Sequence, residues 1–159
     1  MADESILKTQ IERYQQKIFA LVLYLIGGNQ DKAYDITVSS FVKVLRVMSS
    51  IEKEDIFLTA VAAVAIEKSR NAKVVPSFKE SDLENFPLVK RQSLSLLRRS
   101  FQSLSFETRT MLLLRDQMHL SHKNIAAILH VSESTARSQI TQARVVLRDK
   151  VKDILSGGG

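Results

Sequence analysis

The chain has 159 residues, of which 45% are hydrophobic and 25% are charged, and it contains no cysteine. This composition is typical of a folded protein of one domain or two small ones, and it excludes general disorder, disulfide bonds and thiolate chemistry. The longest apolar run, Ile18 to Ile26, is far shorter than the roughly 20 residues that cross a membrane, so we expect no membrane span. The acidic opening "MADESILK" predicts no secretory leader and a cytoplasmic location.

The formal net charge of +6 is concentrated in the second half of the chain. Residues 1–89 contain 11 Lys/Arg and 12 Asp/Glu, whereas residues 90–159 contain 12 and 5. Clustered positive charge of this kind favours binding to nucleic acid over binding to an acidic protein or a membrane surface. A well-solvated basic surface has the same composition, so charge alone leaves the function open.

Helical periodicity predicts three helices in the first half. Apolar residues recur at steps of three and four from residue 6 to residue 25, and Gly27 and Gly28 then end the pattern. The spacing predicts a second helix from about residue 29 to residue 49. A third helix, over about 54–70, is apolar on most sides in "IFLTAVAAVAI" and should be buried between neighbours. Together they predict a first domain over residues 1–73.

Residues 71–89 contain both prolines of the chain and a polar, acidic middle without sustained periodicity. A structureless stretch of this length is uncommon inside one compact domain, so we predict a linker over 74–88. Helical spacing resumes in "LSLLRRSFQSL" and "FETRTMLLLRDQM". Because no strand alternation appears, the sequence predicts an all-α fold of two small helical domains, 1–73 and 89–159, joined by the linker.

The stretch "LSHKNIAAILHVSESTARSQITQAR", residues 120–144, contains two helical patterns separated by a short turn. Ser121 and Ser132 are suitable N-caps for the two helices. In the second helix, Ala136, Ile140 and Ala143 form an apolar inward stripe. The outward side chains are of the types that bind DNA in the major groove: Ser134, Thr135, Arg137, Ser138, Gln139, Thr141, Gln142 and Arg144.

A short helix, a turn and a second helix with a polar outer face predict that residues 89–159 form a helix-turn-helix DNA-binding domain. Two ordinary bundle helices with a solvated outer face would give the same periodicity, and the coincidence with the basic half of the chain makes that alternative weaker.

The run "SLSFETRTMLLLRDQMHLSHKNIAAILHVSESTARSQITQARVVLRDKV" resembles region 4 of the extracytoplasmic-function sigma factors of bacteria. In that family "I-A-x-x-L-x-V-S-x-x-T" precedes a basic, arginine-bearing helix. The segment "AYDITVSSFVKVLR" at 33–46 resembles the region 2 helix that docks on RNA polymerase, and "FLTAVAAVAIEKSRN" at 57–71 lies where the family reads and opens the downstream promoter element. The two matches occur in the family's order, whereas a helix-turn-helix alone would also fit response-regulator output domains.

The resemblance implies two further sets of site residues. The polymerase-docking set is Asp35, Ser39, Lys43 and Arg46, and the set that holds single-stranded DNA is Phe57, Lys68, Arg70 and Lys73. The chain also departs from the family: Tyr34 and Val38 replace an acidic residue and a glutamine of the docking helix. The tryptophan usual near Leu58 is absent, and Ala and Glu replace most of an Asn, Asp and Arg set. Promoter melting is therefore the part of the family's function that the sequence supports least.

The leading hypothesis is a sigma factor-like initiation protein that binds core RNA polymerase and directs it to promoters by reading the minus-35 element. Its partners would be promoter DNA and core RNA polymerase, and the resemblance also allows an anti-sigma factor. The alternative is a degenerate sigma-like protein that binds an anti-sigma factor or another regulator without melting promoters. A third hypothesis is a regulator that uses only the helix-turn-helix, with a dimerising N-terminal domain.

An enzyme has little support in the sequence. The three histidines His119, His122 and His130 lie close together in the chain, but no Cys or acidic partner occurs at the spacing of a metal site. The serines lack a neighbouring base. We therefore expect no catalytic residues, no metal and no cofactor.

Overall fold

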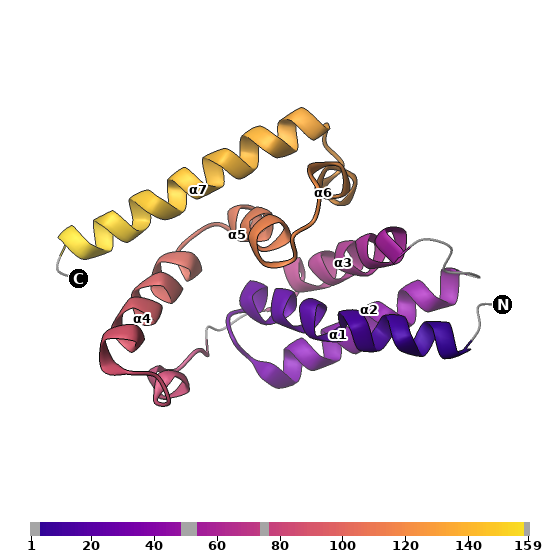
Figure 1. Cartoon of the computed structure of the whole chain (residues 1–159), viewed down its shortest axis with the longest axis horizontal. Coiled ribbons are helices and arrows are strands. Elements are labelled where there is room, and N and C mark those ends of the chain that lie inside the picture. Colours follow the sequence, from indigo (N-terminus) through magenta and orange to yellow (C-terminus); the bar gives the residue numbers. More distant parts are fainter. Residues whose placement is uncertain (1–3, 49–53, 74–76, 158–159) are drawn as a thin grey trace.

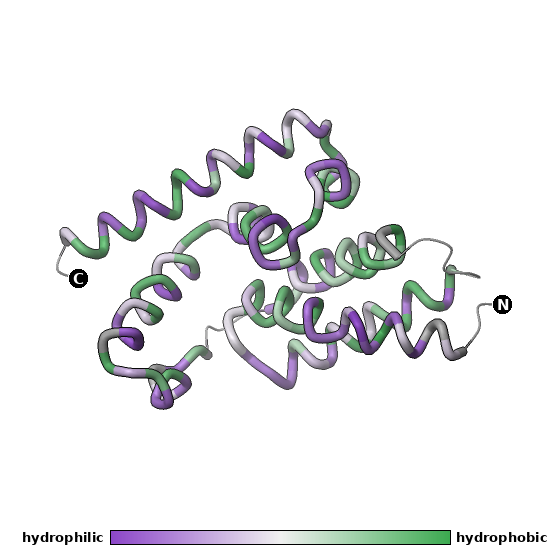
Figure 2. The backbone as a smooth tube through the Cα atoms, viewed as in Figure 1, coloured by the Kyte–Doolittle hydropathy of each residue, from purple (hydrophilic) through white to green (hydrophobic). Residues whose placement is uncertain are grey.

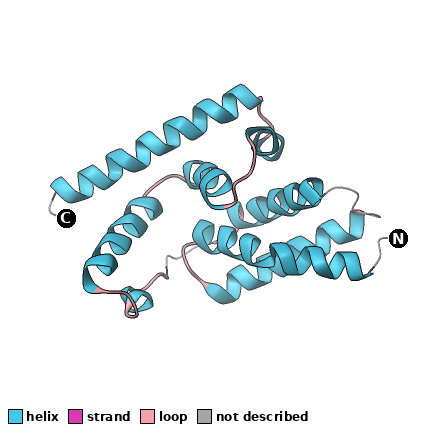
Figure 3. Cartoon of the chain, in the orientation of Figure 1, coloured by secondary structure: helices cyan, strands magenta, loops and turns pink. Residues whose placement is uncertain are grey.

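The structure, a computed structural model, describes residues 4–48, 54–73 and 77–157. Within these ranges it contains helices and no β-strand, which confirms the predicted all-α class (Figure 3). No helix in this part of the chain combines the length and the apolar character needed to cross a membrane.

The first group of helices comprises α1 (Glu4–Ile26), α2 (Gln30–Val47) and α3 (Glu54–Arg70), which all contact one another. Gly27 and Gly28, with φ of +86° and +107°, end α1 in a left-handed conformation that glycine adopts without strain. Asn29 then caps α2, because its side chain accepts a hydrogen bond from the backbone N–H of Lys32. The predicted third helix is confirmed over its full length, and α2 ends slightly before its predicted end.

The core of the first group consists mainly of apolar side chains from all three helices. Phe57 of α3 is completely buried, with its ring centroid 6.0 Å from that of Phe41 on α2. Phe41 and Val44 lie on the inward face of α2, as the periodicity predicts. Buried hydroxyls are satisfied within α2, since Thr37 donates to the carbonyl of Ala33.

The second group contains α4 (Leu88–Gln102), α5 (Phe106–Leu112), α6 (His122–Leu129) and α7 (Glu133–Ser156). A π-helical turn, η2 (Leu113–Gln117), continues α5. The long α7 crosses the top of the view in Figure 1 and contacts α4, α5 and α6. Helix α4 includes Leu88, so it starts one residue before the predicted domain boundary.

The two groups share one hydrophobic core. The core cluster runs from α1–α3 through Leu114 and Met118 to Ile125 of α6 and Ile140 of α7. Figure 2 shows apolar segments in both groups of helices, and α6 contacts both α3 and η2. The linker is more structured than its sequence predicts: it contains a 3-10 turn, η1 (Glu80–Leu83), and Leu83 is buried. Residues 74–76 of the predicted linker lie outside the described residues.

Candidate nucleic-acid interface

Local backbone chemistry fixes the turn between α6 and α7. The hydroxyl oxygen of Ser121 accepts a hydrogen bond from Asn124 N at 3.1 Å, and that of Ser132 accepts one from Thr135 N at 3.1 Å. Both serines are therefore N-caps, as predicted. Between the helices His130 has φ of +58°, and the N–H of Val131 donates to the carbonyl of Ala126 at 3.1 Å. This closed turn sets the angle at which α7 leaves the body of the protein.

The inward stripe of α7 holds it against its neighbours. Ala136, Ile140 and Ala143 are buried, and they pack with Ile125 and Ala126 of α6 and with the interior of the second group. Small residues at Ala126 and Ala136 let the two helices approach closely. The opposite face of α7 is consequently turned to solvent.

The eight predicted DNA-binding residues lie on this solvent face. Thr135 is half-buried, and the other seven are exposed: Ser134, Arg137, Ser138, Gln139, Thr141, Gln142 and Arg144. The hydroxyls of Ser138 and Thr141 donate to carbonyls of their own helix, each at 3.1 Å, which leaves their oxygens free to accept. The structure thus brings the predicted set together as one hydrogen-bonding surface.

The two arginines of this surface have different partners. Arg137 makes a loose ion pair with Glu133 one turn earlier, at 3.5 Å. Arg144 donates two hydrogen bonds to the Asp116 carboxylate, from Nη2 to Oδ1 at 2.5 Å and from Nε to Oδ2 at 3.3 Å. These hydrogen bonds and the negative charge of Asp116 raise the pKa of the Arg144 guanidinium. The π-helical turn η2 carries Asp116. No pattern in the sequence predicts that turn, so the ion pair between Arg144 and Asp116 could not be predicted from the sequence.

Positive charge gathers where α6 and α7 begin. Partial loss of hydration, followed by the positive charges of Arg115 and Arg137, lowers the pKa of the His122 side chain. Arg115 itself donates to the carbonyl of Leu120 at 2.8 Å and is thereby held beside α6. This end of the helix-turn-helix is suited to attract phosphate groups.

The predicted docking residues form a second surface, on α2. Asp35, Lys43 and Arg46 are exposed, and Ser39 is half-buried with its hydroxyl donated to the carbonyl of Ile36 at 3.1 Å. Their spacing of three and four residues places them in one polar stripe along the helix.

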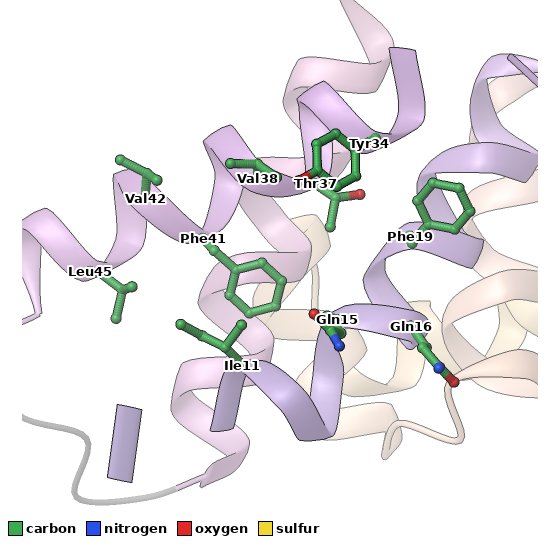
Figure 4. Close-up of a pocket in the computed structure, with 10 residues that line it drawn as sticks. All are labelled: Ile11, Gln15, Gln16, Phe19, Tyr34, Thr37, Val38, Phe41, Val42 and Leu45. Carbon is green, nitrogen blue, oxygen red and sulfur yellow. The ribbon is translucent and has the colours of Figure 1, made fainter. Parts of the chain in front are cut away.

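An apolar groove of about 410 Å³ lies between α1 and α2 beside this stripe (Figure 4). Tyr34 and Val38, which the sequence marked only as departures from the family, are 63% and 42% exposed and line the groove. The remaining lining residues are Ile11, Gln15, Gln16 and Phe19 of α1, and Thr37, Phe41, Val42 and Leu45 of α2. Sequence periodicity found the inner face of α2 but not this exposed apolar edge.

The predicted single-strand set is only partly available, and Phe57 requires correction. Because Phe57 is completely buried in the core of the first group, its ring has no face to stack on a base, and that prediction is wrong. Lys68 is half-buried, whereas Arg70 and Lys73 are exposed. The structure therefore groups the cationic members of the set at the end of α3 without an accompanying aromatic ring on that helix.

Comparisons with known proteins cover almost the whole chain. The profile of the family described as "Sigma-70, region 4" matches residues 94–147. The chain is 26% identical to the ECF RNA polymerase sigma-E factor of Salmonella typhimurium and 25% identical to that of Escherichia coli, in each case over 96% of this chain and 90% of the relative. The sigma-E factor of Haemophilus influenzae is 23% identical over 96% of this chain and 91% of its own length.

A solved structure has the same fold. The sigma factor RpoE in its complex with the anti-sigma factor NepR, from Bartonella quintana, superimposes with a TM-score of 0.62 at 17% identity, over 91% of this chain and 96% of that chain. Sequence relatives and fold thus agree along both groups of helices.

Proposed function

We propose that this chain is an extracytoplasmic-function sigma factor that binds core RNA polymerase and directs it to promoters by reading the minus-35 element with α7. The function involves no covalent step, and such a protein acts where polymerase and chromosome are, in the bacterial cytoplasm. We also propose that residues 1–73 serve as the polymerase-binding unit and residues 89–159 as the DNA-binding unit, with 74–88 as the linker.

The exposed face of α7 is the observation that carries the proposal. It displays Arg137, Gln139 and Gln142 beside small hydroxyl side chains, on a helix whose opposite face is buried. Arginine pairs with guanine and glutamine with adenine in the major groove, and hydroxyls bind bases or phosphates. The region 4 profile covers this helix from its start to Leu147.

Docking on polymerase is assigned to α2. Its polar stripe, Asp35, Ser39, Lys43 and Arg46, lies beside the apolar groove, so the surface combines charged and apolar contacts. Interfaces commonly have this arrangement, with an apolar centre and a polar rim. Tyr34 and Val38 then supply apolar contacts where the family usually has polar ones.

Transcription with purified core polymerase tests the proposal. Core polymerase with this chain should produce transcripts from promoters that carry its minus-35 element. Lys43→Glu should weaken capture of core polymerase, and Arg137→Ala should weaken promoter-specific transcription. The matched controls are Lys152→Glu and Arg148→Ala, which change exposed residues in the second half of α7, beyond the eight residues of the predicted DNA-binding set. Equal transcription from promoter and scrambled templates would contradict the assignment of α7.

A second candidate function rests on the burial of Phe57. It is the single aromatic residue of α3, and unpaired bases are usually held by aromatic stacking together with basic groups. A sigma-like protein that binds an anti-sigma factor or another regulator without melting promoters fits this feature. Capture of core polymerase without transcripts would favour this candidate, whereas promoter-specific transcripts from linear templates would exclude it.

A further inference from the structure

A cavity of about 630 Å³ lies where η1, α4, η2 and α7 meet, apart from the polar face of α7 and from the groove on α2. Its volume is in the range of sites that hold small molecules. Leucine and aromatic side chains form most of the lining, and Tyr24, Phe86, Leu97 and Phe101 are among them. The cavity is therefore suited to a ligand with an apolar, aromatic body.

The charged groups of the lining have a net negative charge. Asp82 and Asp116 contribute two carboxylates, and Arg98 contributes one guanidinium. This guanidinium is already engaged, because Nη1 lies 3.7 Å from Asp82 Oδ2 and the central carbon lies 4.4 Å from the centroid of the Phe78 ring. The remaining charge, at Asp116, favours a cationic ligand over a neutral or an anionic one.

An unpaired acceptor borders the same cavity. Gln117, which follows Asp116 in η2, lines it, and Gln117 Oε1 is buried without a hydrogen-bond partner among residues 4–48, 54–73 and 77–157. A buried acceptor without a donor is unfavourable, so a donor supplied from the cavity would stabilise it. An ammonium group carries three donors and no acceptor. The charge of the lining and the unpaired oxygen therefore favour the same chemical group.

Asp116 connects this cavity to the DNA-reading face of α7. Its carboxylate accepts the hydrogen bonds from Arg144 at 2.5 and 3.3 Å. The side chains of this pair are 52% and 48% exposed, so water screens the attraction and the pair is easily exchanged. An ammonium group beside Asp116 competes with Arg144 for the same carboxylate. Occupation of the cavity would therefore make the Arg144 guanidinium available to DNA phosphates.

We propose that this cavity binds a small primary amine with an apolar aromatic body, and that the bound amine releases Arg144 from Asp116 and strengthens duplex binding. The aromatic body lies against the leucine and aromatic lining, and the ammonium group lies beside Asp116 and Gln117. The coupling to DNA rests on the proposed function, whereas amine binding itself does not. Because coupling is reciprocal, duplex DNA raises the affinity for the amine by the same factor.

Three indoles of similar shape and different charge test the site in the full chain. Tryptamine is a cation at neutral pH, tryptophol is neutral, and indole-3-propionate is an anion. Each is titrated into the isotope-labelled chain and followed by the NMR shifts of backbone amides, which should change around Leu97 and Gln117. Tryptamine should bind at least about tenfold more tightly than the other two, since only it makes charged hydrogen bonds to Asp116. Equal affinities for tryptamine and tryptophol, or no binding of tryptamine, would overturn the site.

A pair of leucine variants locates the site without altering Asp116. Leu97 lines the cavity and is 49% exposed, so Leu97→Arg places a cation at its edge. This variant should weaken tryptamine binding by about tenfold or more. The matched control is Leu155→Arg, at a 67% exposed leucine of α7 outside the lining, which should bind tryptamine normally. Equal affinity for tryptamine in the two variants would overturn the location.

Duplex binding measures the release of Arg144. Saturating tryptamine should raise the affinity for a duplex that carries the minus-35 element, by at most about fivefold, because an exposed ion pair contributes little. Tryptophol should cause no rise. The Arg144→Ala variant should still bind tryptamine, but its duplex affinity should not respond, and this control also accounts for tryptamine that binds DNA directly. Unchanged duplex affinity of the unaltered chain at saturating tryptamine would overturn the coupling.

The site and the proposed function fail in separate measurements. Amine binding is measured without DNA, and duplex binding by the unaltered chain is measured without amine. Loss of amine binding with duplex binding retained would overturn the site and leave the proposed function standing. Amine binding without any duplex binding would contradict the proposed function and the coupling, while the amine site would be supported.

Discussion

The polar face of α7 and the basic end of α3 carry similar side chains in different surroundings. On α7, Arg137 and its polar neighbours face solvent, while the small apolar residues of the same helix are buried. On α3, Arg70 contacts Glu107 and Phe106 of another helix, and Lys68 borders a cleft beneath α6. The polar face of α7 is thus open to solvent, whereas part of the proposed single-strand set is in contact with neighbouring helices.

The contrast shows that packing, more than residue type, decides which side chains are available for binding. Phe57 has the chemistry for base stacking but lies at the centre of the core. Tyr34, which no binding motif marked, is 63% exposed beside the polar stripe of α2. Substitutions can therefore distinguish residues that hold the fold from residues that bind a partner.

The largest effect is expected for Phe57→Ala. Removing a completely buried ring beside Phe41 should lower the free energy of unfolding by about 3–5 kcal/mol, and DNA or polymerase binding should fail only through unfolding. Urea denaturation measures the loss. Phe57→Leu is the control, because it keeps most of the buried volume and should cost less. A loss below about 1 kcal/mol for the alanine variant would contradict the burial of the ring.

Arg137→Ala should have a smaller effect that is confined to DNA. If Arg137 pairs with a base, the loss of specific binding is about 1–3 kcal/mol, and selectivity relaxes at one base pair. Its ion pair with Glu133 is exposed, so the melting temperature should hardly change. Binding to promoter duplexes with each base varied measures selectivity, and Arg148→Ala is the matched control. Uniform weakening across all duplexes would instead assign Arg137 to a phosphate.

Arg144 and Asp116 form the next test, because the ion pair competes with DNA for the same guanidinium. Arg144→Ala should weaken binding to all sequences and reduce the salt slope by about one phosphate contact. Asp116→Ala frees Arg144 and should strengthen DNA binding by less than about 1 kcal/mol, since the pair is about half exposed. Titration of duplex binding against salt concentration measures both. Weaker binding in Asp116→Ala would show that Asp116 positions Arg144 for DNA.

Local signals in the sequence predicted the helices well. Gly27 and Gly28 end α1, Ser121 and Ser132 cap α6 and α7, and the apolar spacing of α3 gave its bounds. Each of these features depends on a few neighbouring residues, such as a hydroxyl that accepts a hydrogen bond or a residue that tolerates positive φ.

Features that depend on distant parts of the chain were not predictable. The pairing of Asp116 with Arg144 joins residues 28 positions apart, and the ring contacts of Phe78 join α1 to α4. The linker has no helical period because its apolar residues, Phe78 and Leu83, pack singly against other elements. Periodicity within a segment carries no information about such contacts.

The smallest expected effect is a pH dependence of duplex binding that depends on His122. Partial desolvation and the nearby cations Arg115 and Arg137 lower the pKa of the His122 imidazole in the free chain. DNA phosphates beside α6 would offset these positive charges and raise that pKa, so binding would take up a proton. This contribution is fully present below the free-chain pKa and disappears as the pH rises through the higher pKa of the complex.

Duplex affinity should therefore increase as the pH falls from 8 to 6, by at most about tenfold for each unit by which the pKa rises. His122→Gln should abolish the dependence, whereas His119→Asn, at an exposed histidine before α6, should preserve it. An identical pH profile in the His122→Gln variant would place the DNA backbone away from the start of α6.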